Sequence, residues 1–174
     1  TDVFNKPNAT LTEFNNQTTA QVTNAFENEG TVGTLHNEGT FANGITNKQN
    51  GQITTLTNDG TINVGITNEQ GGNIGTITNN QQLDKIDNTG EITTITNAST
   101  ITDVFNKSGA TIGTFDNETG ATITNEFSNE GTVTTLDNKG TFTQGITNKD
   151  GGEIENLTND GTINVGITNE QGGN

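Results

Sequence analysis

The chain has 174 residues, of which 25% are hydrophobic, and its 21 acidic residues against 6 basic ones give a formal net charge of −15. Nucleic acids and anionic membrane surfaces attract basic proteins, so this charge argues against both as partners. No apolar stretch approaches the roughly 20 residues of a membrane-spanning helix. The first residues, TDVF, do not resemble a signal peptide, so any targeting sequence is expected outside this stretch.

Low hydrophobicity combined with a high net charge is typical of disordered chains. Thr, Asn and Gly together supply about half of the residues here. However, the few Ile, Val, Leu and Phe residues recur at regular spacing, and a thin, regular fold needs little apolar surface per residue. The regularity therefore predicts an ordered repeat protein.

A long duplication organises the chain. Residues 1–73 align without a gap on residues 102–174, and 51 of the 73 aligned positions are identical. TDVFNK opens both stretches, and NDGTINVGITNEQGGN closes both. We interpret residues 1–174 as one continuous solenoid segment, with residues 1–101 as a first copy and residues 102–174 as a partial second copy. The native protein is expected to continue beyond it.

A shorter unit of about ten residues, N-x-G-x-[IVLF]-x-x-[IVLF]-x-N, recurs from end to end, as in Asn88–Asn97 and Asn129–Asn138. Its two apolar residues are often three positions apart, which strict strand alternation would place on opposite faces. Each unit is therefore predicted to form two short strands around a bend, followed by an Asn-x-Gly turn. Where the spacing is four, from Ile62 to Ile66, a bulge or a straighter run is expected.

Turn residues every ten positions and the β-branched content exclude helix. Two units together make a rung of about 20 residues, with four apolar side chains inward and an Asn at two corners. The prediction is an all-β fold, a right-handed parallel β-helix (β-solenoid) whose stacked Asn side chains form hydrogen-bonded ladders. Antiparallel hairpins are the alternative, but the alternation of unit lengths favours stacked rungs.

The residue types needed for catalysis or metal binding are scarce. His36 is the only histidine, its counterpart in the second copy is Asp137, and the chain has no Cys, Trp or Tyr. Gly71–Ile74 and Gly151–Ile154 lack the Asp and the third Gly of calcium-binding repeats. We therefore expect no enzyme activity, no cofactor, and no catalytic, cofactor-binding or metal-ligating residues.

Three further residue sets have ordinary explanations. The threonines before the corner Asn are expected to face outward, as ranks of Thr do in ice-ordering solenoids. With one Thr per strand and several interruptions, they are better explained by strand propensity; they are Thr46, Thr57, Thr67, Thr78, Thr96, Thr147, Thr158 and Thr168.

The eight Phe residues match between copies and are predicted to be core residues. The N-x-[ST] sequons are no more than chance predicts in such a chain, among them Asn8, Asn16, Asn97, Asn106 and Asn117.

The N-x-G-T-I-x-x-[IL]-x-N rungs, such as Asn28–Asn37 and Asn58–Asn68, resemble the passenger β-helices of Gram-negative autotransporters and filamentous-haemagglutinin-like adhesins, including vacuolating-cytotoxin-like repeats. The resemblance covers the whole chain but specifies the architecture better than any one member. It implies export to the bacterial cell surface, attachment to the outer membrane, and a role in adhesion and virulence. Contact with a host or neighbouring cell surface, or self-association, would follow. The leading hypothesis is a structural or adhesive stalk that presents a distal region of the same long chain. The alternative is a ligand-binding solenoid, with ice or carbohydrate as the ligand.

Overall fold

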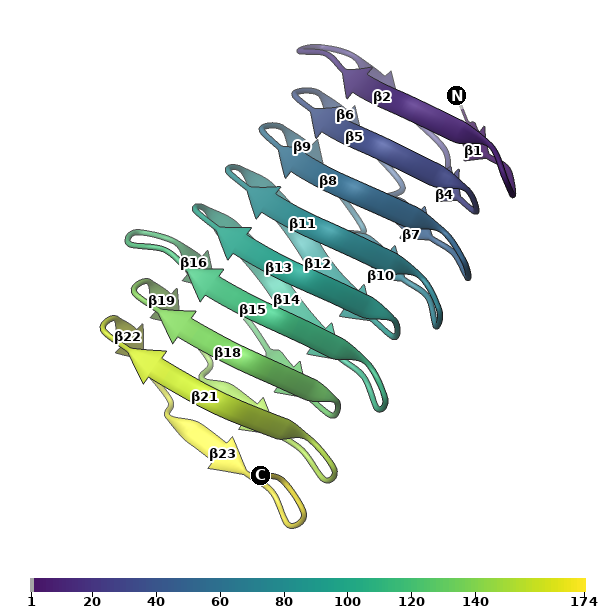
Figure 1. Ribbon diagram of the computed structural model, residues 1–174. Helices are drawn as coiled ribbons and strands as arrows, with labels where there is room; N and C mark the ends of the chain where they lie inside the picture. Colours follow the sequence, from purple (N-terminus) through teal and green to yellow (C-terminus); the bar gives the residue numbers. More distant parts are fainter. Residues whose placement is uncertain (1) are drawn as a thin grey trace.

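The structure is a computed structural model that describes residues 2–174 as a stack of about eight turns of parallel β-strand (Figure 1). Every described strand pair is parallel, which excludes the antiparallel alternative. In Figure 1 the chain crosses the front to the upper left, returns behind, and descends from the N-terminus to the C-terminus. That path is a right-handed coil, as predicted. No helix in the described residues could cross a membrane.

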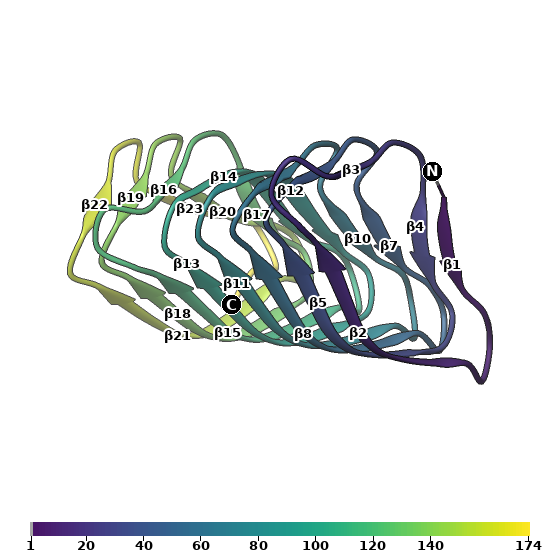
Figure 2. The ribbon, with the colours of Figure 1, turned by 90° about the horizontal axis from the view of Figure 1, so that it is seen from above.

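One side of the coil, which we call the front sheet, consists of eight seven-residue strands, one per turn. In order along the stack they are β2 (Thr10–Asn16), β5 (Thr31–Asn37), β8 (Gln52–Asn58), β11 (Asn73–Asn79), β13 (Glu91–Asn97), β15 (Thr111–Asn117), β18 (Thr132–Asn138) and β21 (Glu153–Asn159). The view from above shows the turns enclosing a common interior (Figure 2).

The other side, the rear sheet, is interrupted in most turns. Its two-residue strands are β3 (Gln21–Val22), β6 (Thr40–Phe41), β9 (Thr61–Ile62), β16 (Thr122–Ile123), β19 (Thr141–Phe142) and β22 (Thr162–Ile163). Its three-residue strands are β1 (Val3–Asn5), β4 (Phe26–Asn28), β7 (Ile45–Asn47), β10 (Ile66–Asn68), β17 (Phe127–Asn129), β20 (Ile146–Asn148) and β23 (Ile167–Asn169). Only β12 (Gln82–Asn88) and β14 (Thr100–Asn106) span the whole rear side.

The predicted bend between the two apolar residues of a unit is milder than expected. In β18, Val133 and Leu136 are both fully buried, because Thr134 and Thr135 between them both lie outward. Strand pairing continues from Val133 to Thr135 and skips only Thr134. A unit with this spacing is thus one continuous strand with a local irregularity, and the prediction of two separate short strands is wrong for these units.

Units with a four-residue spacing break into two strands, where the sequence predicted only a bulge or a straighter run. Between β9 and β10 the chain leaves the sheet at Asn63, Val64 and Gly65, and both Val64 and Gly65 have positive φ, at 65° and 97°. Glycine adopts this left-handed region without strain, whereas a β-branched residue does not. A Cβ on Gly65 would lie only 2.2 Å from the backbone oxygen of Lys85, so glycine is also required there by space.

Two ladders of buried asparagine run along the corners, as the sequence predicts. In each, the Nδ2 of one Asn donates to the Oδ1 of the Asn one turn later, for example Asn58 to Asn79 at 2.9 Å. Successive members are 18 to 23 residues apart. The second Nδ2 hydrogen usually meets a backbone oxygen, such as that of Thr100 at 3.0 Å from Asn79. The amides therefore satisfy one another inside the coil, which is what makes their burial tolerable.

The apolar core is two residues wide on each side, with a few wider turns where Phe replaces Ile or Leu. Phe26 and Phe41 pack edge to face at 5.7 Å, and Phe127 and Phe142 repeat this contact at 5.4 Å. Phe14 and Phe115 complete the two trios. The trios are offset by 101 residues, so the duplicated sequence forms the same packing twice.

Two of the eight Phe residues contradict the prediction that all are core residues. Phe4 is 50% exposed and Phe105 occupies the equivalent outward position one copy later. Each lies under a lysine ammonium, from Lys6 at 5.0 Å and Lys107 at 4.7 Å. These cation–π contacts place the rings on the surface of the rear sheet.

Candidate binding surface

The outward side of the front sheet carries a regular array of threonines. In β8, β11 and β13 the sequences TLT, TIT and TIT each place two threonines outward around a buried Leu or Ile. The strands pair in register, so these residues form two parallel columns. We call this set the threonine array: Thr55, Thr57, Thr76, Thr78, Thr94 and Thr96.

This array corrects the sequence-based expectation of one Thr per strand. The partner of Thr57 is Thr55, which lies in the same continuous strand and on the same face. The column through Thr55 continues in register to Thr34 on one side and to Thr114 and Thr135 on the other, which makes six turns in a row. The column through Thr57 ends at His36 on one side and Asp116 on the other.

The six side chains of the threonine array are half-buried, and none makes a hydrogen bond within the described part of the chain. Strands β8 and β11 contain no charged residue, and β13 contains only Glu91 at its start. β-Branched side chains have a restricted χ1, so the hydroxyls and methyls are held in fixed directions. The centre of the front sheet is therefore a neutral surface of ordered hydroxyl and methyl groups.

The rear sheet is different at the equivalent outward positions. Its column before the corner Asn includes Phe4, Glu27, Asp87, Phe105 and Ser128 among its threonines. Ion pairs cross this side, such as Lys48 Nζ to Glu27 Oε2 at 2.8 Å. The centre of the front sheet, at β8, β11 and β13, is thus more regular and less charged than the rear sheet, whereas both ends of the front sheet carry charged residues such as Glu13 and Asp137.

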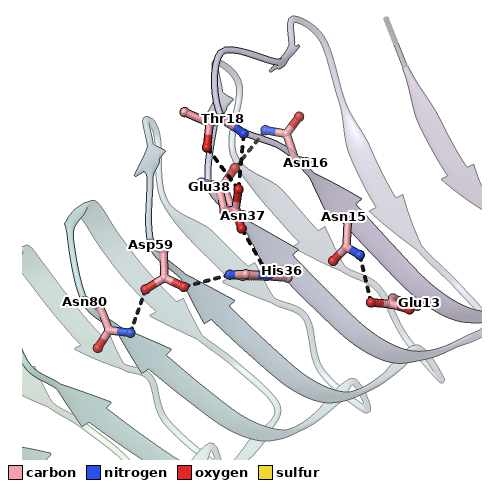
Figure 3. A network of polar contacts seen from close by, with 9 residues as sticks. All are labelled: Glu13, Asn15, Asn16, Thr18, His36, Asn37, Glu38, Asp59 and Asn80. Atoms are coloured by element: carbon pink, nitrogen blue, oxygen red, sulfur yellow. Dashed lines mark hydrogen bonds and ion pairs between the residues drawn. The ribbon is translucent and has the colours of Figure 1, made fainter.

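His36 borders the threonine array and links three turns (Figure 3). Its Nε2 lies 2.7 Å from Oδ2 of Asp59, and Oδ1 of Asp59 accepts a hydrogen bond from Nδ2 of Asn80 at 2.8 Å. The Asn80 amide, followed by His36, holds the pKa of the Asp59 carboxyl below its usual range. His36 lies at the surface, with its side chain 32% exposed.

In the second copy the same border is made by different residues. Asp137 replaces His36 and Lys139 replaces Glu38, and Lys139 Nζ lies 2.9 Å from Asp137 Oδ2 and 3.5 Å from Asp116 Oδ1. These contacts raise the pKa of Lys139, with the hydrogen bond to Asp137 as the main cause. His36 contacts the following turn, whereas Lys139 contacts the preceding turn through Asp116. Both copies therefore link neighbouring turns here but with different residues, which fits a structural role for both sets.

Other sites considered from the sequence are not assembled. Among the described residues no three His, Cys, Asp or Glu side chains are grouped so that they could hold a metal ion. Four of the sequon asparagines are buried ladder members, namely Asn16, Asn97, Asn106 and Asn117, whereas Asn8 and Asn156 are exposed. An open hollow of about 620 Å³ lies along the loops that lead from the rear sheet to the front sheet. Its lining is mostly polar, including Glu29, Lys48 and Glu69, and contains no aromatic ring on which a sugar could stack.

No family model matches this chain, and no curated protein or solved structure matches it either. The solenoid architecture therefore rests on the structure itself, and the likeness to adhesin passengers rests on the repeated N-x-G-T-I rungs alone.

Proposed function

We propose that this chain is a repeat module of a long secreted bacterial surface protein, an autotransporter or adhesin passenger, and that it acts as a rigid spacer that presents a distal region. The observation that supports this most directly is the duplication. The 101-residue copy corresponds to five turns, from Asn28 through Asn47, Asn68, Asn88 and Asn106 to Asn129 of one ladder. A whole number of turns per copy lets copies be added without disturbing the stack.

The packing supports the same proposal. Each turn contacts mainly the turn before and the turn after, so length can grow without a new kind of core. The acidic composition also agrees, because the negatively charged side chains lie at the surface, in loops and on strands, where they keep a long rod solvated. Export to the cell surface and attachment to the outer membrane belong to this proposal and come from the resemblance to passenger β-helices.

The proposal is tested by changing the number of copies in the full-length protein on its native cells. At about 4.8 Å per turn, four extra 101-residue copies should move the distal end about 95 Å further from the membrane, measured by cryo-electron tomography with a labelled distal tag. Antibodies against residues 2–174 should label intact cells. An unchanged reach, or labelling only after the cells are opened, would contradict the spacer.

A competition experiment separates a spacer from an adhesive stalk. Excess purified chain should leave attachment of the cells unchanged if the distal region makes the contact. Competition by the purified chain would assign adhesion to the solenoid surface itself.

A further inference from the structure

We propose that the threonine array on the front sheet binds the surface of ice. This goes beyond the spacer function, and it is a property of the isolated chain that does not depend on where the chain is displayed.

The first step is the regularity of the array. Two threonines on one strand face are about 6.6 Å apart, and neighbouring turns are about 4.8 Å apart. In-register pairing from β8 through β11 to β13 repeats this spacing without a shift. Two columns with a constant spacing between them and a regular repeat along the coil suit a crystalline partner more than a flexible chain.

The second step is that strand propensity alone does not explain the array. The rear sheet needs strand formers equally, yet the outward residues of β12 and β14 include Lys85, Asp87, Asp103 and Phe105. On the front sheet, six successive turns keep Thr in one column. Both sheets need strand-forming residues, so strand propensity does not explain why the uninterrupted column of threonines occurs only on the front sheet.

The third step is the chemistry. A protein partner usually meets aromatic or arginine anchors, and a sugar usually stacks on an aromatic ring. The threonine array has neither, and the chain has no Trp or Tyr. Its free hydroxyls and fixed methyls can hold water molecules in ordered positions between the columns, at little entropic cost because the side chains are already fixed. Charged groups, which would organise water around themselves, lie at the borders of the array, as with Asp59 and Asp116.

The test uses the purified 174-residue chain and measures inhibition of ice recrystallisation and thermal hysteresis. The wild-type chain should inhibit recrystallisation. Thr76→Lys, at the centre of the array, should require at least about tenfold more protein for the same effect. The matched control is Thr67→Lys, which places the same charge on an outward, half-buried Thr of the rear sheet and should leave the activity unchanged. Circular dichroism and thermal unfolding of all three proteins establish that the fold is retained.

Two milder variants keep the test informative if Thr76→Lys perturbs the sheet. Thr76→Ser keeps the hydroxyl and removes the methyl, and Thr76→Val does the reverse; each should reduce the activity less than Thr76→Lys. Inactivity of the wild-type chain, or equal losses in Thr76→Lys and Thr67→Lys, would overturn the proposal. So would retention on crystalline cellulose or chitin without any effect on ice, because the array would then recognise a polysaccharide.

Discussion

The buried asparagines carry much of the specificity of this fold. Asn79 is fully buried; it accepts from Asn58 at 2.9 Å and donates to Asn97 at 2.9 Å. Asn79→Ala would leave a donor on one neighbour and an acceptor on the other without partners. At about 1–3 kcal/mol for each unsatisfied buried group, the loss in unfolding free energy should be about 2–6 kcal/mol. Urea unfolding measures this, with the outward Thr78→Ala as control; a loss no larger than that of the control would contradict the role of the ladder.

Asp59 gives a second residue-scale prediction, for the pKa of one carboxyl. Because the Asn80 amide is the largest cause of its lowered pKa, Asn80→Ala should raise that pKa more than His36→Ala does, measured by NMR titration. A carboxyl with a lowered folded pKa stabilises the fold above its unfolded pKa, and this contribution is lost as the pH falls through the folded value. The side chain is 38% exposed, so the effect on global stability should be small. The reverse order of the two variants would show that the histidine dominates.

At the scale of the strand, the break in the NVGITN unit is a point of strain. Val64 has φ of 65° and is 54% exposed, so its side chain gains little from burial while its backbone is unfavourable. Val64→Asn should raise the unfolding free energy by about 1 kcal/mol, because Asn tolerates this region better. Val165, one copy later, is 72% exposed but is not among the positive-φ residues, so Val165→Asn is the matched control and should give no gain. Equal shifts in the two denaturation midpoints would show that backbone strain is not the cause.

The strands also show where sequence reasoning stopped. The inward direction of the corner Asn followed from its two-residue distance to an apolar residue, as from Leu56 to Asn58, and this was confirmed. The sequence did not predict that a unit with a three-residue apolar spacing forms one continuous strand. A three-residue apolar spacing looks like a corner, but the hydrogen-bond ladder of the neighbouring turns holds the chain extended and turns two successive residues outward. Thr54 and Thr55 are such a pair, and this is why the second threonine column was missed.

At the scale of the whole molecule, the parallel coil, its hand and its rung of about 21 residues agree with the sequence-based prediction. The fold could be predicted because the sequence repeats: a residue that departs from the pattern in one unit is outweighed by the other units that keep it. The exceptions are single residues that depart from the repeat. Phe4 and Phe105 look like core residues by type, but their register relative to Asn5 and Asn106 puts them outside. The absence of enzyme activity and the location of the protein remain predictions.

The Asn ladders have a mechanical consequence. Tension along the axis of the coil pulls turns apart one after another, because the covalent chain runs across the axis and only hydrogen bonds and side-chain packing join one turn to the next. One turn of about 21 residues adds about 4.8 Å to the rod while stacked, but about 70 Å once extended. Under load, the coil can therefore lengthen more than tenfold turn by turn without breaking a covalent bond. Stepwise unfolding of turns would dissipate the energy of a sudden pull. The rod would recover its length when the turns restack and the Asn–Asn hydrogen bonds form again.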